Sequence, residues 1–236
     1  MQISSSAPIG VFDSGFGGLT VIRALQQAMP QEGFIYYGDT AHVPYGNRSP
    51  EELKSFALQI GNYLAAQGCK LLFIACNTST ALAYDLLQEK LSIPVVGVIE
   101  PVVEQVRQAG GKAPIGVIAT AATVNSGVYQ RLFASKIPER TVHMMACPAF
   151  VPLVEAGITS GPKVNQAVDN YLAPLKAAGI NTLVMGCTHY PFLIEEFRSY
   201  LGPEVQLLDP ALATVEQGRS LLAELGLLAQ EKGLPT

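Results

Sequence analysis

Two cysteines stand in matching surroundings at distant points of the chain. Cys76 and Cys187 each end an apolar run and are followed by polar residues. We expect Thr78 or Ser79 in one case, and Thr188 in the other, to cap the helix that begins there. Each thiol would then face the positive end of a helix dipole, which favours the thiolate. Either cysteine alone fits a buried packing residue better than a catalytic one. Their equivalent positions favour a pair of thiols that act on opposite faces of one substrate.

A glycine-rich turn follows the first apolar run, at residues 13–20. It leads into a helical pattern and offers backbone N–H groups to an anion. The turn is not a dinucleotide fingerprint, because Thr20 stands where a third glycine is needed, and it has no P-loop lysine. A carboxylate ligand fits it at least as well as a phosphate. Asp13, at the end of the apolar run, either lies near Cys76 or caps the following helix.

Two polar loops, at residues 38–46 and 147–155, follow further apolar runs. Each fits an active-site cover or ordinary surface, and on a surface Glu155 would be one more solvated carboxylate. His189, two residues beyond Cys187, either assists that thiol or makes a structural hydrogen bond. The three histidines are far apart in the sequence and there is no Cys-x-x-Cys motif, so no metal site is predicted.

Short apolar runs alternate with helical patterns along the chain. The clearest helix follows Ser49, with Pro50 at its first position and Glu52 completing a capping box. Strands are expected at 9–13, 34–37, 71–76, 95–99, 115–119, 142–146, 183–187 and 205–208, and further helices at 19–29, 82–90, 164–175 and 214–230. Continuously apolar strands alternating with helices predict an α/β fold with parallel sheets covered on both faces.

Eight strands fit one (β/α)₈ barrel or two doubly wound domains of about four strands each. An internal repeat is visible: residues 9–12 match 115–118, 35–37 match 142–144, 72–76 match 183–187, and 100–101 match 209–210. The offsets of 106, 107, 111 and 109 residues differ by only five, which predicts a duplicated unit. A duplicated half-barrel would give the same pattern, so the repeat predicts pseudo-symmetry without choosing between the architectures.

Composition excludes several classes of protein. Of the 236 residues, 14% are charged and 49% apolar, whereas an average soluble domain has about 25% charged residues. With a net charge of −4, this is the composition of a compact folded chain. The 15 basic and 19 acidic residues include no Lys/Arg run that would bind nucleic acid or anionic lipid. No apolar run approaches the roughly 20 residues of a membrane span.

The four cysteines are expected to be thiols. The first residues lack the charged and apolar regions of a secretory signal, so the cytoplasm is the expected compartment, where disulfides are rare. Cys69 follows a helix-ending glycine, and Cys147 precedes a proline and has no partner in the repeat. Both are expected to be inert, because free cysteine is commonly a buried packing residue.

Four motifs point to a family. They are FDSGFGGLTV at residues 12–21, YGDTAHVPYG at 37–46, ACNT at 75–78 and GCTHYP at 186–191. In this order and over nearly the whole chain, they make the sequence resemble the glutamate racemases, cofactor-independent enzymes of the aspartate/glutamate racemase superfamily.

The resemblance implies an organisation and a biological role. It implies two pseudo-symmetric α/β domains with the active site in the cleft between them, which favours two domains over the barrel. The first would comprise residues 1–98 and a returning segment 209–236, and the second residues 99–208. It also implies a homodimer that supplies D-glutamate for peptidoglycan synthesis, and thereby for cell-wall biogenesis and cell shape.

The resemblance also assigns roles to residues. Inverting an α-carbon requires an acid/base group on each face of the substrate. By resemblance, Cys187 deprotonates L-glutamate and Cys76 deprotonates D-glutamate. Asp13 would assist Cys76, and Glu155 and His189 would assist Cys187. The substrate would be held by Asp13, Ser14, Tyr45, Gly46, Asn77, Thr78, Thr188 and His189.

Three other readings stay open. An aspartate or hydantoin racemase of the same superfamily would share the two cysteines. A hydrolase with Cys187 as nucleophile and His189 as its partner would form an acyl-enzyme and need no Cys76. A bilobed ligand-binding protein would bind an anion without exchanging an α-proton.

Overall fold

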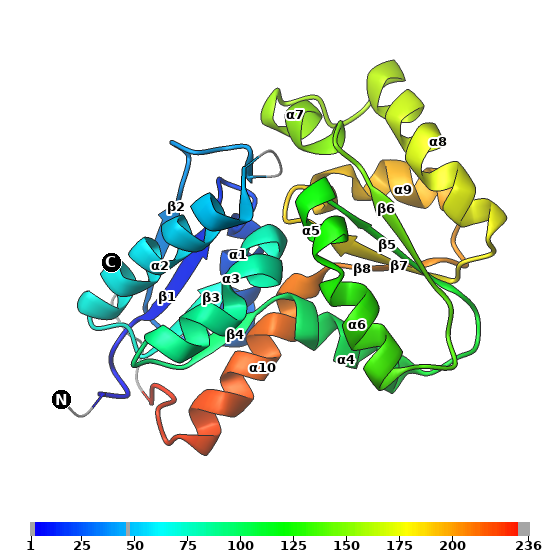
Figure 1. Ribbon diagram of the computed structural model, residues 1–236. Helices are drawn as coiled ribbons and strands as arrows, with labels where there is room; N and C mark the ends of the chain where they lie inside the picture. The colour runs from blue at the N-terminus through cyan, green and yellow to red at the C-terminus, as the bar shows by residue number, and fades with distance from the viewer. Residues whose placement is uncertain (1–2, 46–47, 231–236) are drawn as a thin grey trace. The chain divides into compact units, whose positions relative to one another are not determined.

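The computed structural model describes residues 3–45 and 48–230. It divides into two compact units (Figure 1): unit 1 is formed by the chain up to Pro101 and from Ala211 onward, and unit 2 by Val102–Pro210. Each unit contains its own four-stranded sheet, and every strand pairing is parallel. The α/β prediction is therefore confirmed, and a single eight-stranded barrel is excluded.

The elements alternate as expected. Up to the boundary between the units they are β1 (Ile9–Asp13), α1 (Leu19–Ala28), β2 (Phe34–Gly38), α2 (Pro50–Ala66), β3 (Leu71–Ile74), α3 (Asn77–Lys90), β4 (Val95–Gly97) and α4 (Ile99–Ala109), which contains that boundary. They continue with β5 (Ile115–Ala119), α5 (Ala121–Ser126), α6 (Val128–Lys136), β6 (Val142–Ala146), α7 (Phe150–Glu155), α8 (Pro162–Ala177), β7 (Thr182–Gly186), the 3₁₀ helix η2 (Tyr190–Leu193), α9 (Ile194–Leu201), β8 (Gln206–Leu208) and α10 (Pro210–Glu224).

The two sheets have the same strand order. In unit 1 it is β2-β1-β3-β4, and in unit 2 it is β6-β5-β7-β8. In each unit the chain passes from the first strand to a neighbour on one side, and then crosses to the other side of the first strand. The expected duplication is thus confirmed by topology, and each unit has one point where the direction of winding switches.

Side chains that alternate along β3 cover both faces of the unit 1 sheet. Leu72 and Ile74 belong to a core that includes Ala57 of α2 and Leu87 of α3. Leu71 and Phe73 point to the opposite face, where α10 (orange in Figure 1) passes them at Gly218. A helix from the end of the chain therefore covers one face of a sheet built from its beginning.

A buried ion pair in unit 1 makes hydrogen bonds to the segment that follows α10. The ammonium of Lys70 contacts the carboxylate of Glu32, and both side chains are almost fully shielded from solvent. The same ammonium donates to the carbonyl oxygens of Ser5 (2.6 Å) and Leu227 (2.8 Å). Glu32 accepts from the backbone N–H of Ala229 at 2.9 Å. These bonds satisfy charges whose burial would otherwise be costly.

The expected element ends need correction around the two cysteines. Strand β3 ends at Ile74, and α3 starts at Asn77 instead of residue 82, because the sulfur of Cys76 itself caps the helix. Neither Thr78 nor Ser79 is that cap. In the second copy of the repeat, Thr188 caps no helix, because the element that follows β7 is η2, which has no side-chain cap.

The last helix also differs from the expected range of 214–230. It begins at Pro210, a residue that suits the first turn, and ends at Glu224. Gly226 follows with φ +67°, a left-handed conformation typical of a residue that stops a helix.

Substitution of Gly218 by alanine is expected to destabilise unit 1. A methyl group there would lie closer to the ring of Phe73 than a carbon–carbon contact allows, and that ring is fully buried. Overpacking of this kind costs about 1–3 kcal/mol. Urea unfolding should show a lower midpoint for Gly218→Ala, whereas Ser220→Ala, an exposed change on the same helix, should leave it within error. An unchanged midpoint for Gly218→Ala would contradict this packing.

Candidate active site

The switch point of unit 1 brings Asp13 and Cys76 to one edge of the sheet. Asp13 is the last residue of β1, and Cys76 lies two residues beyond the end of the adjacent parallel strand β3. Both side chains are buried. Open parallel sheets bind ligands at the carboxyl ends of the strands where the winding switches. The topology therefore places both predicted residues where such a sheet forms its site.

The turn after β1 is fixed around the Asp13 carboxylate. Oδ2 of Asp13 accepts from the N–H of Gly15 at 3.0 Å, and the phenol of Tyr36 donates to the Gly15 carbonyl oxygen. A Cβ at Gly18 would lie 2.5 Å from Cβ of Asp13, and a Cβ at Gly38 would lie 2.9 Å from the Gly15 oxygen. The glycines are therefore needed for close packing. Asp13 is not the cap of α1, whose N-cap residue is Gly18.

The surroundings of Cys76 favour the neutral thiol over the thiolate. Its sulfur accepts from the N–H of Ser79 at 3.4 Å and lies 3.9 Å from Oγ of Ser14. Burial raises the pKa of Cys76, and the negative charge of Asp13 raises it further, while the interactions with Ser79 and Ser14 lower it by less. The N-terminus of α3 does favour the thiolate through the Ser79 N–H, but burial and Asp13 have larger opposing effects on the pKa of Cys76.

The loop after β2 is organised by the buried carboxylate of Asp39. This carboxylate accepts from the phenol of Tyr45 at 2.5 Å and contacts Nδ1 of His42 at 2.7 Å. The imidazole stacks on Phe56 of α2 with 4.1 Å between ring centroids. Tyr45 packs against Cys76, and its pKa is raised by burial and by the bond to Asp39. Tyr45 is thus a neutral phenol at the site, anchored by a carboxylate that the sequence analysis did not single out.

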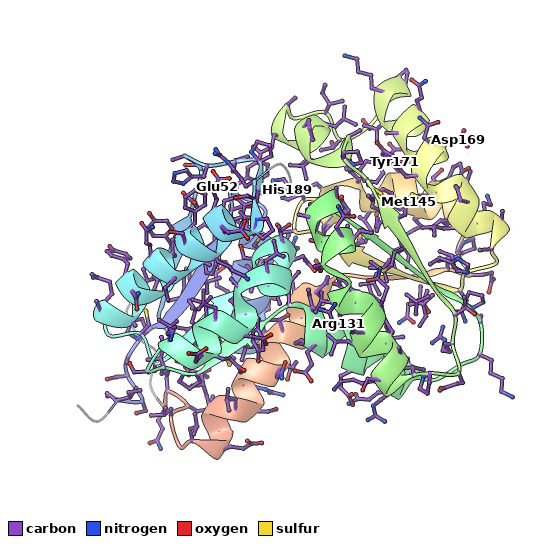
Figure 2. The ribbon with its side chains drawn as sticks, viewed as in Figure 1. Glu52, Arg131, Met145, Asp169, Tyr171 and His189 are labelled. Atoms are coloured by element: carbon purple, nitrogen blue, oxygen red, sulfur yellow. The ribbon has the colours of Figure 1, made fainter. Side chains whose placement is uncertain are left out.

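In unit 2, a thiol, an imidazole and a carboxylate form a chain. Cys187 directly follows β7, and its sulfur lies 3.9 Å from Nδ1 of His189. Nε2 of the same ring lies 2.6 Å from Oε1 of Glu155. The imidazole (labelled in Figure 2) is buried, whereas the carboxylate is 31% exposed. The imidazole can therefore pass a proton or a charge between the thiol and a partly solvated carboxylate.

An aromatic cluster holds the helix that carries Glu155. Phe150, at the start of α7, is in contact with rings from α8, η2 and α9, each with 5.2 Å between centroids. These rings are Tyr171 (labelled in Figure 2), Tyr190 and Phe197. Because η2 begins one residue after His189, the cluster fixes the elements on both sides of the Glu155–His189 bond.

The other predicted binding residues are distributed between the two units. In unit 1, Ser14 follows Asp13 in the chain, and Asn77 and Thr78 follow Cys76. In unit 2, Thr188 follows Cys187. All four side chains are buried. Gly46 lies outside the described residues.

Two tyrosines near the thiols were missed by the sequence analysis. Tyr36 lies close enough to Asp13 and Cys76 for their charges to raise its pKa, after burial. Tyr129 of α6 is fully buried, and the charge of Cys187 adds to the effect of burial in raising its pKa. Neither position carries a local sequence signal, since each depends on a tertiary contact.

Neither a metal-binding cluster nor a membrane-spanning helix occurs among the described residues. It contains no group of three or more His, Cys, Asp or Glu side chains arranged to hold a metal ion. Within the same residues, no helix combines the length and apolar character needed to cross a bilayer.

The model of the Asp/Glu/Hydantoin racemase family matches residues 9–218. The chain therefore belongs to this family. It is 45% identical over 225 residues to a glutamate racemase of Desulforudis audaxviator, a match that covers 95% of this chain and 82% of the relative.

Solved structures agree with the sequence match. A glutamate racemase of Francisella tularensis in complex with D-glutamate is 40% identical with a TM-score of 0.92, covering 98% of this chain and 86% of the other. A glutamate racemase of Thermus thermophilus in complex with β-chloro-D-alanine is 43% identical with a TM-score of 0.87, covering 98% and 87%.

Substitution of Asp13 by asparagine is expected to make Cys76 more reactive. Asparagine can still accept the Gly15 N–H, but it removes the negative charge that raises the pKa of Cys76. More thiolate at pH 8 should speed alkylation by iodoacetamide severalfold at Cys76. Peptide mass spectrometry would follow Cys76, with Cys187 in the same sample as an internal control. Unchanged or slower alkylation of Cys76 would contradict the electrostatic role of Asp13.

Proposed function

We propose that this racemase interconverts L- and D-glutamate by moving protons between the substrate and two thiols, Cys76 and Cys187. The observation that carries the proposal is the matched position of the thiols, each just beyond the second central strand of a sheet with the same strand order. The identity of 43% to 45% shared with several glutamate racemases supports glutamate as substrate.

The two thiols need opposite protonation states for each turnover. With L-glutamate, the thiolate of Cys187 removes the α-proton and the thiol of Cys76 delivers a proton to the other face; with D-glutamate the roles are reversed. The raised pKa of Cys76 suits a resting proton donor. Asp13 would assist Cys76, and the pair His189 and Glu155 would assist Cys187.

The carbanion between the two proton transfers has no cofactor to accept its charge. Fixed dipoles that are already in place are the alternative, because they need no reorganisation at the moment of reaction. The proposed ligands of the substrate supply hydroxyl, amide and backbone groups of this kind, together with the Asp13 carboxylate and His189; they are Ser14, Tyr45, Gly46, Asn77, Thr78 and Thr188.

Membership of the racemase family supports three further parts of the proposal. We place the reaction in the cytoplasm, with a homodimer as the working form. Its product, D-glutamate, would supply peptidoglycan synthesis and hence cell-wall biogenesis and cell shape.

One observation favours a second candidate. The order Cys187, His189, Glu155 is that of a thiol nucleophile, its base and the group that orients the base. A hydrolase built on this chain would form an acyl-enzyme and would keep its activity without Cys76. Family membership and the second buried thiol favour the racemase.

Replacing either thiol is expected to abolish racemisation. Because each enantiomer needs one thiol on each face, Cys76→Ala and Cys187→Ala should each lower turnover of both enantiomers by more than about 100-fold. Circular dichroism would follow turnover, and NMR would follow incorporation of α-deuterium from D₂O. The unaltered enzyme should exchange the α-proton of glutamate and not that of aspartate.

The controls separate the candidates. Full racemisation of both enantiomers by either variant would exclude the two-thiol mechanism. Esterase or amidase activity retained by Cys76→Ala, with a trapped acyl group on Cys187, would favour the hydrolase. Exchange with aspartate in place of glutamate would correct the substrate alone.

A further inference from the structure

A buried hydroxyl in the first turn of α3 makes no hydrogen bond to any of the described residues. It belongs to Ser79, whose side chain is fully buried and whose Oγ has no partner. The neighbouring Thr80 shows that partners are available in this turn, because its hydroxyl donates to the Ile74 carbonyl oxygen at 3.2 Å and accepts from the Val98 N–H at 3.4 Å. Unpaired buried hydroxyls are rare in folded proteins and call for an explanation.

Ser79 lies against the sulfur of Cys76. Its N–H donates to Sγ at 3.4 Å. Its hydroxyl makes no hydrogen bond to the neutral thiol, but it lies near enough to the sulfur to favour the thiolate, which lowers the pKa of Cys76. A neutral thiol is a weak hydrogen-bond acceptor, whereas a thiolate is a strong one. The hydroxyl therefore gains a good acceptor only when Cys76 loses its proton.

The titratable groups around Cys76 do not stabilise its thiolate. Of the titratable residues of unit 1 that act on this thiol, Asp13 faces it from the end of β1 and disfavours its negative charge. Tyr36 of β2 and Tyr45 of the following loop are phenols whose pKa is raised by burial, so they bring no charge. Burial and Asp13 would both penalise a thiolate that lacked a nearby donor.

We infer that the Ser79 hydroxyl donates a hydrogen bond to the sulfur of Cys76 when this residue is a thiolate, and that this bond stabilises the thiolate during turnover. The inference rests on the proton-transfer role proposed for Cys76. The thiolate exists before Cys76 takes the α-proton of D-glutamate, and again after it has given a proton to the carbanion made from L-glutamate. Ser79 is a positioning residue in this account, because its effect on the reaction passes through Cys76.

Two single variants separate this role from a structural one. Ser79→Ala removes a hydroxyl that is unpaired in the resting protein and introduces a good helix former, so the urea midpoint should not fall. The pKa of Cys76, read from the pH dependence of its alkylation, should rise by about one unit, which slows alkylation at pH 8 about tenfold. Thr80→Val is the matched control: it should lower the midpoint and leave the pKa of Cys76 unchanged.

Isotope effects give a second readout that a structural defect would not produce. If Ser79→Ala slows proton transfer at Cys76, the primary isotope effect on kcat/KM should increase with α-deuterated D-glutamate and decrease with α-deuterated L-glutamate. This is because removal of the α-proton from L-glutamate occurs at Cys187 and is then no longer the slow step. A general loss of structure would not move the two values in opposite directions.

The outcomes distinguish the inference from the proposed function. If Cys76→Ala is inactive but Ser79→Ala alters neither the alkylation profile nor the isotope effects, the role of Ser79 is excluded and the two-thiol mechanism stands. If Cys76→Ala still racemises both enantiomers, both fail. A raised pKa of Cys76 together with opposite changes of the two isotope effects would establish the role of Ser79.

Discussion

The change of winding direction beside β1, repeated beside β5, is the constraint on which the candidate site depends. All strands of a parallel sheet end at the same edge, and the helices that follow them diverge only where the winding switches, so backbone and side chains stay accessible to a ligand there. Asp13 and Cys76 occupy that edge in unit 1, and Cys187 follows the equivalent strand in unit 2. The duplication thus places Cys76 and Cys187 at equivalent positions, each just beyond a central strand of its sheet.

The two copies differ in their chemistry. In unit 1 a carboxylate acts directly on the thiol and opposes its ionisation. In unit 2 an imidazole stands between Glu155 and the thiol, so the carboxylate acts on Cys187 through a group that can itself hold a proton. A racemisation needs two groups that are in opposite protonation states at any moment. Equivalent positions with unlike neighbours provide a physical basis for that difference.

Local patterns in the sequence were sufficient where the structure depends on local contacts. The capping box of Ser49 and Glu52 forms as predicted, and the eight strands and the repeat are present. The choice between a barrel and two sheets depends on whether β4 pairs with β5, a non-local contact. The start of α3 was missed because a sulfur, and not one of the usual oxygen side chains, caps it.

The same distinction applies to the site. Asp13, Cys76 and Cys187 could be picked out from their positions at strand ends, whereas Glu155 and His189 were assigned their roles through the family resemblance. The catalytic roles of all five stay predictions. Tyr36 and Asp39 were not picked out, and Ser79 was expected only as a helix cap, because each gains its significance from one contact made in the folded chain. The aromatic cluster around Phe150, which combines four elements, could not be read from any single segment.

The attachment of the C-terminal segment to unit 1 has a consequence for the order of folding during synthesis. Lys70 and Glu32 leave the ribosome long before Leu227 and Ala229, their partners beyond α10. Until α10 and the residues after it have been made, Phe73 is not packed against Gly218, and the ion pair lacks its hydrogen bonds to Leu227 and Ala229. Unit 2, by contrast, is continuous in sequence from Val102 to Pro210. The nascent chain therefore completes its second unit first, and the unit that begins the sequence is the last to be closed.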